Sequence, residues 1–298
     1  MAVEPIAAQH AERQVILARR TATELGRLWQ LVDRNRIAAS WGALLPQALA
    51  VLGTSQATAA ASAGTYVDDA LEAQGTAAAP AGRVAPEMFA GIASDGRPLA
   101  SLLLQPALTT LDQIKQGASP ARALSAGRFT LDLISRTQVA DAGRVAVGTA
   151  IAARPDVGGY VRMIVGKTCS RCLILAGRRY RWNQGFQRHP RCDCRHIPVA
   201  EAVPDDVTVN PRAYFDSLSG DEQDDLLGHA GAQAVREGAD IAKVVNARRG
   251  MQTATDGRLY TTEAAGRRPR LMPEQIFREA DGSRDEAVRL LRLHGYIR

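Results

Sequence analysis

The feature that most constrains this chain is a cluster of potential metal ligands between Cys169 and Pro198. The stretch reads CSRCLILAGRRYRWNQGFQRHPRCDCRHIP, and it holds all 4 cysteines and two of the 5 histidines of the chain. Cys169 and Cys172 have the C-x-x-C spacing that lets two thiolates from one tight turn bind the same ion. Further donors follow near its end: His189, Cys192, Cys194 and His196. Two such groups separated by a loop are typical of a structural zinc site.

Two other interpretations of the cysteines are weaker. A redox motif explains Cys169 and Cys172 but leaves Cys192 and Cys194 without a role. A pair of disulfides needs an oxidising compartment, and the N-terminus lacks the basic region and apolar segment of a secretory signal. We therefore expect the chain to be made and folded in cytoplasm, where paired cysteines bind metal more often than they form disulfides.

The residues alone leave the exact ligand set open. Cys169 and Cys172 form the firm pair. The first candidate set adds His189 and one of Cys192 or Cys194, and the second candidate set consists of the four cysteines with His189 hydrogen-bonded nearby. His196 ranks last as a ligand, and the remaining histidines are isolated in the sequence.

The cluster has the chemistry of a structural site rather than a catalytic one. A catalytic zinc keeps an open position beside a carboxylate base, whereas here thiolate donors are abundant and Asp193 is the one acid within the cluster. A β element of about forty residues buries too little surface to fold alone, and metal binding can supply the missing free energy. The sequence also lacks phosphate-loop, dinucleotide-binding and nucleophile-elbow motifs, so we assign no catalytic residue and no small-molecule substrate.

The rest of the chain predicts helices around this element. Apolar residues make up 46% of the chain and aromatic residues 5%, which favours helices packed through alanine and leucine. We predict helices over 11–53 and 118–152, two helical pieces broken before Pro106, and strands at 160–166, 177–182 and 194–199. No apolar run approaches the length of about 20 residues that is needed to span a bilayer, so no membrane contact is expected.

These elements predict an α+β fold that is mainly α-helical, with a small zinc-stapled β element between helical N- and C-terminal blocks. The expected domains are a helical N-terminal arm (1–115), a core with the Cys/His zinc element (116–203) and a helical C-terminal region (204–298) with a basic loop at 246–270. Two capping boxes, Ser219-x-x-Glu222 and Ser283-x-x-Glu286, predict helix starts in the last region.

Positive charge gathers around the cysteine cluster. Residues 151–200 contain ten Lys and Arg against two Asp and Glu, a local balance of +8 in a chain of net charge +6. Such a patch suits a phosphate backbone or an acidic protein, but arginines can equally keep a small domain in solution. The candidate nucleic-acid-binding residues are Arg171, Arg178, Arg179, Arg181, Arg188, Arg191 and Arg195.

The cluster and the C-terminal region together resemble a known family. The C-x-x-C pair, a short L-x-x-G-like segment and the His-Pro-x-Cys-x-Cys stretch followed by Pro198 resemble MuF-type minor head proteins, or head morphogenesis proteins, of tailed bacteriophages. Residues 210–251 and 270–297 are similar to the C-terminal half of such proteins in phages of actinobacteria. The resemblance covers about 118–298, and His196 is an extra histidine relative to the family pattern.

The resemblance implies a virion component. Together with the thiolate-rich cluster and the missing catalytic motifs, it favours a non-enzymatic head protein with a structural Zn²⁺. Such a protein is made in the host cytoplasm, enters the procapsid with the portal protein, and resides in the capsid interior or at the portal vertex. The packaged DNA would be a further partner, during packaging or ejection. Two alternatives stay open: a capsid maturation protease, since some relatives carry that label, and a zinc-stabilised protein that binds DNA without sequence preference.

Overall fold

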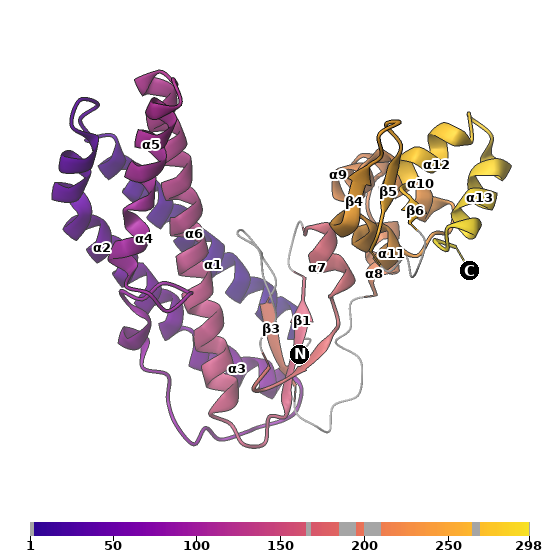
Figure 1. Cartoon of the computed structure of the whole chain (residues 1–298). Helices are drawn as coiled ribbons and strands as arrows, with labels where there is room; N and C mark the ends of the chain where they lie inside the picture. Colours follow the sequence, from indigo (N-terminus) through magenta and orange to yellow (C-terminus); the bar gives the residue numbers. More distant parts are fainter. Residues whose placement is uncertain (1–2, 165–167, 185–194, 200–209, 264–268, 298) are drawn as a thin grey trace. The chain divides into compact units, whose positions relative to one another are not determined.

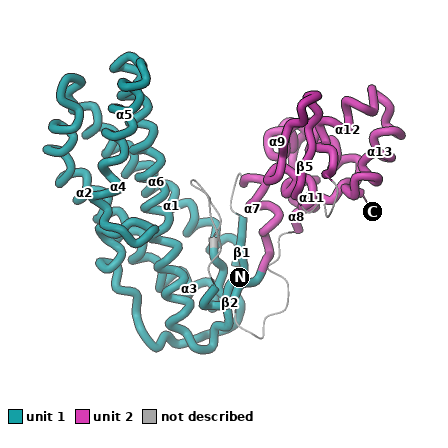
Figure 2. The backbone as a smooth tube through the Cα atoms, viewed as in Figure 1, with its two compact units in different colours: residues 1–165, 179–207 teal, residues 166–178, 208–298 magenta. Residues whose placement is uncertain are grey.

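The computed structural model describes residues 3–164, 168–184, 195–199, 210–263 and 269–297. The chain forms two compact units, drawn in two colours in Figure 2: unit 1 comprises 1–165 and 179–207, and unit 2 comprises 166–178 and 208–298. Helices account for 64% of the described residues, and two small antiparallel sheets accompany them. The prediction of an α+β fold dominated by helices is therefore confirmed.

Unit 1 is built around one long helix. Its helices are α1 (Val3–Trp29), α2 (Ile37–Ala61), α3 (Ala63–Ala73), the 3-10 turn η1 (Pro86–Phe89), α4 (Leu99–Leu103), α5 (Gln105–Lys115) and α6 (Pro120–Ala152). Helix α6 packs against α1, α2, α3 and α5, so it forms the axis of the bundle (Figure 1). The predicted helix at 118–152 and the break before Pro106 are both confirmed.

The prediction of helix over 11–53 is wrong at 30–36, because the chain turns between α1 and α2. The Asp33 carboxylate accepts the N–H of Asn35 at 2.9 Å, and the Asp33 N–H donates to the Ser40 hydroxyl at 3.0 Å. These local bonds offer the backbone an alternative to the helical pattern, as aspartate side chains commonly do. Pro46 lies inside α2 and does not end it.

Close backbone contacts hold the bundle of unit 1 together. A Cβ on Gly127 of α6 would lie 2.1 Å from the Thr110 hydroxyl and 2.5 Å from the Trp29 ring. Trp29 in turn packs edge-to-face against Trp41 of α2, with ring centroids 5.0 Å apart. The buried Trp41 donates its indole N–H to the Leu103 carbonyl at 2.7 Å. Glycine at position 127 of α6 therefore leaves the space that the Trp29 ring occupies.

The helical segment Ile37–Ala73 is long and apolar enough to cross a membrane, judged by length and composition alone. This corrects the expectation that no run approaches that length. The segment is apolar because it is rich in alanine, glycine and leucine. Its Trp41, Leu52 and Val67 side chains are fully buried within unit 1, and 28% of its most apolar 18-residue window is buried.

A three-stranded antiparallel sheet completes unit 1. Strand β1 (Gly159–Met163) lies between β2 (Arg179–Arg181) and β3 (Arg195–Val199), which confirms the three predicted strands. Tyr160 pairs with Tyr180 on one side and with Pro198 on the other. A Cβ on Gly159 would lie 2.1 Å from the Tyr180 carbonyl oxygen, so the β1–β2 contact requires glycine there.

Unit 2 consists of short elements. Its helices are α7 (Ser170–Ile174), α8 (Pro211–Asp216), α9 (Gly220–Leu227), α10 (His229–Arg236), α11 (Ile241–Ala247), the 3-10 turn η2 (Arg248–Gly250), α12 (Pro273–Glu279) and α13 (Arg284–Leu293). Its sheet has the order β4 (Met251–Thr253), β5 (Leu259–Thr261) and β6 (Arg270–Leu271). The predicted basic loop at 246–270 thus contains the β4–β5 hairpin. Phe215, Met272 and Tyr296 are fully buried in unit 2.

Side-chain caps begin most helices of unit 2. The first predicted capping box is complete, since Ser219 accepts the Glu222 N–H and Glu222 accepts the Ser219 N–H. In the second, Ser283 accepts the Glu286 N–H, but both oxygens of the Glu286 carboxylate accept from Arg289 instead. An ion pair within one turn of α13 therefore replaces the reciprocal half of that box.

Candidate metal turn and basic strand

The C-x-x-C pair lies at the start of α7 in unit 2. Both Cys169 and Cys172 are thiols, Cys172 is buried, and Cys169 is half-buried. Cys169 is the N-cap of α7, and its sulfur accepts the backbone N–H of Cys172 at 3.4 Å. A backbone donor aimed at sulfur stabilises negative charge on it, and the thiolate is the form that binds metal. The turn thus fits one half of a tetrahedral thiolate site.

The other half of the predicted site cannot be compared with this turn. His189, Cys192 and Cys194 lie outside the described residues, as do Arg188 and Arg191. Among the residues that the structure does describe, no group of three or more His, Cys, Asp and Glu side chains could hold a metal ion. The zinc site with Cys169 and Cys172 therefore stays a prediction.

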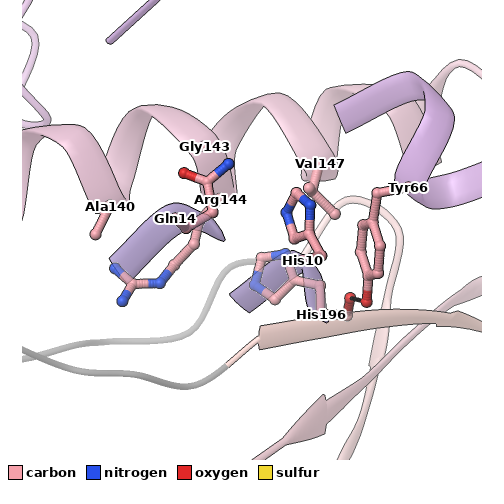
Figure 3. A pocket seen from close by; sticks show the side chains of 8 residues that line it. All are labelled: His10, Gln14, Tyr66, Ala140, Gly143, Arg144, Val147 and His196. Carbon is pink, nitrogen blue, oxygen red and sulfur yellow. Dashed lines mark hydrogen bonds between the residues drawn. The ribbon is translucent and has the colours of Figure 1, made fainter. Parts of the chain in front are cut away.

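His196, the last-ranked ligand, lies in a cluster of aromatic rings in unit 1. Its ring lies against Tyr160 with centroids 4.2 Å apart, and its carbonyl accepts the Tyr66 hydroxyl at 2.7 Å. Tyr66 stacks on His10 of α1 at 4.1 Å, and Figure 3 shows these side chains lying toward one another. The sequence gives no sign of this contact, since 186 residues separate His10 from His196 and no short motif joins them.

The pocket around this cluster is small and has buried polar walls. Gln14, Arg144 and His10 are each 6% exposed, and the cavity volume is about 10 Å³. The Gln14 amide nitrogen donates to the Ala59 carbonyl at 3.0 Å, and Arg144 pairs with Asp141 at 2.8 Å. About one water molecule fits such a volume. The cluster therefore joins α1, α3, α6 and β3.

The candidate arginines fall into different positions. Arg171 and Arg178 are exposed in unit 2, and Arg179 and Arg181 are exposed in unit 1. Arg195 belongs to β3, but its side chain lies outside the described part of the chain.

Two other basic residues of the same stretch are buried and structural. Arg154 is 3% exposed, pairs with Asp68 and donates to the Ala150 carbonyl, which joins α3 to the end of α6. Arg162 is 1% exposed within β1. The +8 balance of residues 151–200 is thus not all available for a partner.

One exposed residue of this region is not among the candidates predicted from the sequence. Trp182 directly follows β2 and is 52% exposed, although large aromatic side chains are usually buried. The backbone N–H of Trp182 donates to the Gly158 carbonyl at 3.2 Å, which holds this backbone beside β1. The signal was present in the sequence as a tryptophan next to three arginines, RRYRW.

Comparison with known proteins gives one match. No curated protein and no solved structure matches the chain. The family described as VG15 protein matches residues 1–218, which include α1–α6, the unit 1 sheet, the C-x-x-C turn and the candidate arginines. This match covers most of the chain and extends through the N-terminal helices, where the MuF resemblance had no specific motif. The chain therefore belongs to the VG15 family of phage-associated proteins.

Proposed function

We propose that this protein is a structural minor head protein of a tailed phage, acting with the portal protein in head morphogenesis. The family match over residues 1–218 carries the assignment to phage, and the cysteine motif and C-terminal segments favour the MuF-type role. The helical bundle and the capped C-terminal unit supply a scaffold. A head protein of this kind needs contact surfaces rather than an active site.

The role can be tested in the phage that encodes the protein. We expect mass spectrometry of purified virions to detect the protein, and deletion of its gene to reduce the yield of DNA-filled heads. Co-expression with the portal and major capsid proteins should place it in procapsids. Its absence from both virions and procapsids would reject the proposal.

A proteolytic role makes a different prediction. Co-expression with scaffold and major capsid proteins would then cleave one of them, and one point substitution that preserves folding would stop the cleavage. Under our proposal no such cleavage occurs.

We further propose that Cys169 and Cys172 hold one structural Zn²⁺ together with ligands from His189, Cys192 and Cys194. The supporting observation is the N–H of Cys172 directed at the Cys169 sulfur, which prepares one thiolate pair within a single turn. Zinc would close the loop between this turn and the second ligand group and so compensate for the small core of that segment.

Metal analysis tests the zinc site directly. We expect one zinc per chain, release of zinc by Cys169→Ser or Cys172→Ser, and faster hydrogen exchange in residues 168–184 after chelation. Ser170→Ala is the matched control, because it changes the same turn without removing a ligand, and it should keep the metal. A folded protein that contains no zinc and exchanges no faster with chelator would refute the site.

A further inference from the structure

Within the basic residues 157–192, one described part is exposed and forms no ion pair with another described residue. No Asp or Glu occurs between Asp156 and Asp193, while eight Lys and Arg do. The buried Arg162 is unavailable to a partner. Arg179 and Arg181 are exposed, and neither forms an ion pair with a residue that the structure describes. Their charge is therefore available to an anionic partner.

The strand geometry aligns these two arginines. β2 is an edge strand of the sheet, because its one neighbour within that sheet is β1. Side chains alternate along a strand, so Arg179 and Arg181 share one face and Tyr180 takes the other. Tyr180 stacks against Tyr160 with ring centroids 5.4 Å apart, which anchors the strand from its covered face. Both arginines thus lie on a strand whose backbone pairs with β1.

Trp182 adds an apolar, planar group beside the two charges. It is 52% exposed, whereas Trp29 and Trp41 are 4% and 0% exposed. Two guanidinium groups with an exposed indole match the two parts of an unpaired nucleotide, the phosphate and the base face. In a duplex the base faces are already stacked, and an acidic peptide offers carboxylates without a stacking partner.

We propose that Arg179, Arg181 and Trp182, the β2 surface, bind single-stranded nucleic acid. The arginines contact the backbone phosphates and Trp182 stacks on a base. Such binding tolerates any sequence, because every base has a π-face, and it weakens as salt rises. The inference goes beyond the proposed head role and does not depend on the zinc site.

The three tryptophans make a fluorescence titration selective for this surface. Trp29 and Trp41 are buried, so quenching by an added oligonucleotide reports Trp182. Oligo(dT) is added to the full-length protein at about 50 and about 200 mM salt. The oligo(dT)·oligo(dA) duplex and heparin serve as a paired nucleic acid and as a polyanion without bases.

We expect oligo(dT) to quench Trp182 and to bind more tightly than the duplex or heparin. Trp182→Leu, followed by anisotropy of a labelled oligonucleotide, should weaken binding on the order of 10-fold, and Trp182→Phe should weaken it less. Arg179→Ser with Arg181→Ser should reduce the slope of log affinity against log salt by about 1.4. The matched control, Arg19→Ser with Arg20→Ser, removes the same charge from exposed positions of α1 and should leave the affinity within about twofold.

Circular dichroism separates loss of binding from loss of folding for each variant. Equal affinity for oligo(dT) and heparin would overturn the proposal, and so would unchanged binding by folded Trp182→Leu. A loss of affinity in the α1 control as large as in the β2 double variant would show a general charge effect and would also overturn it.

Discussion

Units 1 and 2 are both helical, but they stabilise their helices in different ways. In unit 1, α1, α2 and α6 are 27, 25 and 33 residues long, and within the described residues α2, α3, α4 and α5 begin without a side-chain cap. In unit 2 the longest helix has 10 residues. Five of its helices begin at a capping side chain, namely Cys169, Asn210, Ser219, Asp240 and Ser283.

Helix length sets how much a helix depends on its ends, but it does not decide which helices are capped: within the described residues the short α3, α4 and α5 are uncapped, and the long α6 begins at the Ser119 cap. A long helix satisfies most of its backbone internally and gains stability from the face that it buries, so its ends matter little. A helix of eight residues leaves four N–H groups unpaired at its start, half of its backbone donors, unless side chains accept them. We therefore expect unit 1 to be sensitive to changes in packing and unit 2 to be sensitive to changes at helix ends.

The largest expected effect is that of Gly127→Ala in α6. The new Cβ would lie 2.1 Å from the Thr110 hydroxyl and 2.7 Å from the Pro106 carbonyl oxygen, and backbone cannot move aside easily. We expect a loss of about 3 kcal/mol in the free energy of unfolding of unit 1. Denaturation followed by tryptophan fluorescence measures it, because all 3 tryptophans, Trp29, Trp41 and Trp182, belong to unit 1.

Gly148→Ala is the matched control for Gly127→Ala. It lies in the same helix, and a Cβ there meets no atom within 4 Å. Alanine is the better helix former by about 1 kcal/mol, so this substitution should stabilise unit 1 slightly. If both substitutions destabilised unit 1 equally, close packing at Gly127 would not be what holds α5 and α6 together.

Sequence patterns predicted elements whose signals are local. The strands around Tyr160 and the capping box at Ser219 depend on neighbouring residues, and the structure contains them. The turn at Asp33 was missed because one aspartate can cap a turn as readily as it can occupy a helix surface. The reciprocal bond of Glu286 was mispredicted because Arg289 competes for the same carboxylate.

Contacts between distant segments were not predictable in this way. The stack of His10 on Tyr66 and the bond from Tyr66 to His196 join three elements far apart in the chain, and no spacing rule connects them. The C-x-x-C turn was predictable from spacing, but the donor from Cys172 to Cys169 was not, since it depends on α7 beginning at that cysteine. The C-x-x-C spacing therefore predicted the candidate ligands, but the hydrogen bond to the Cys169 sulfur could be found only in the folded structure.

A buried hydroxyl in unit 2 gives the next effect. Tyr296 is fully buried, donates to the Leu271 carbonyl at 3.0 Å, and burial raises its pKa to about 12, so it remains a donor at neutral pH. Tyr296→Phe leaves that carbonyl without this donor and should cost about 1–2 kcal/mol. Hydrogen exchange of unit 2 amides measures the loss. Unchanged exchange would mean that packing alone holds the C-terminal segment.

Helix caps give a smaller effect that distinguishes the two units. Ser219→Ala removes the acceptor for the Glu222 N–H at the start of an eight-residue helix, and it should destabilise unit 2 by about 1 kcal/mol. Ser119→Ala removes the matching acceptor for the Arg122 N–H at the start of the 33-residue α6. We expect that change to fray one turn and to cost less. Equal costs in the two units, measured by hydrogen exchange, would contradict the dependence on helix length.

The smallest effect concerns the pH dependence of unit 2. His294 accepts the Leu271 N–H through Nδ1 at 3.3 Å, and burial lowers its pKa below the ordinary 6.5, with Arg270 adding to this and Glu279 opposing it. The unfolded chain therefore binds a proton more readily than unit 2 does, and the stability of unit 2 falls as the pH drops below about 6.5.

The variant His294→Asn isolates this contribution, because its side-chain oxygen can still accept the N–H but does not titrate. Protection of unit 2 amides, corrected for intrinsic exchange, should fall between about pH 7.5 and about pH 5.5 more in the wild type than in His294→Asn. Tryptophan fluorescence should show no difference between the two proteins, because the tryptophans belong to unit 1. An identical pH response of the unit 2 amides in both proteins would show that protonation of His294 does not destabilise unit 2. The acid sensitivity would then belong to other groups.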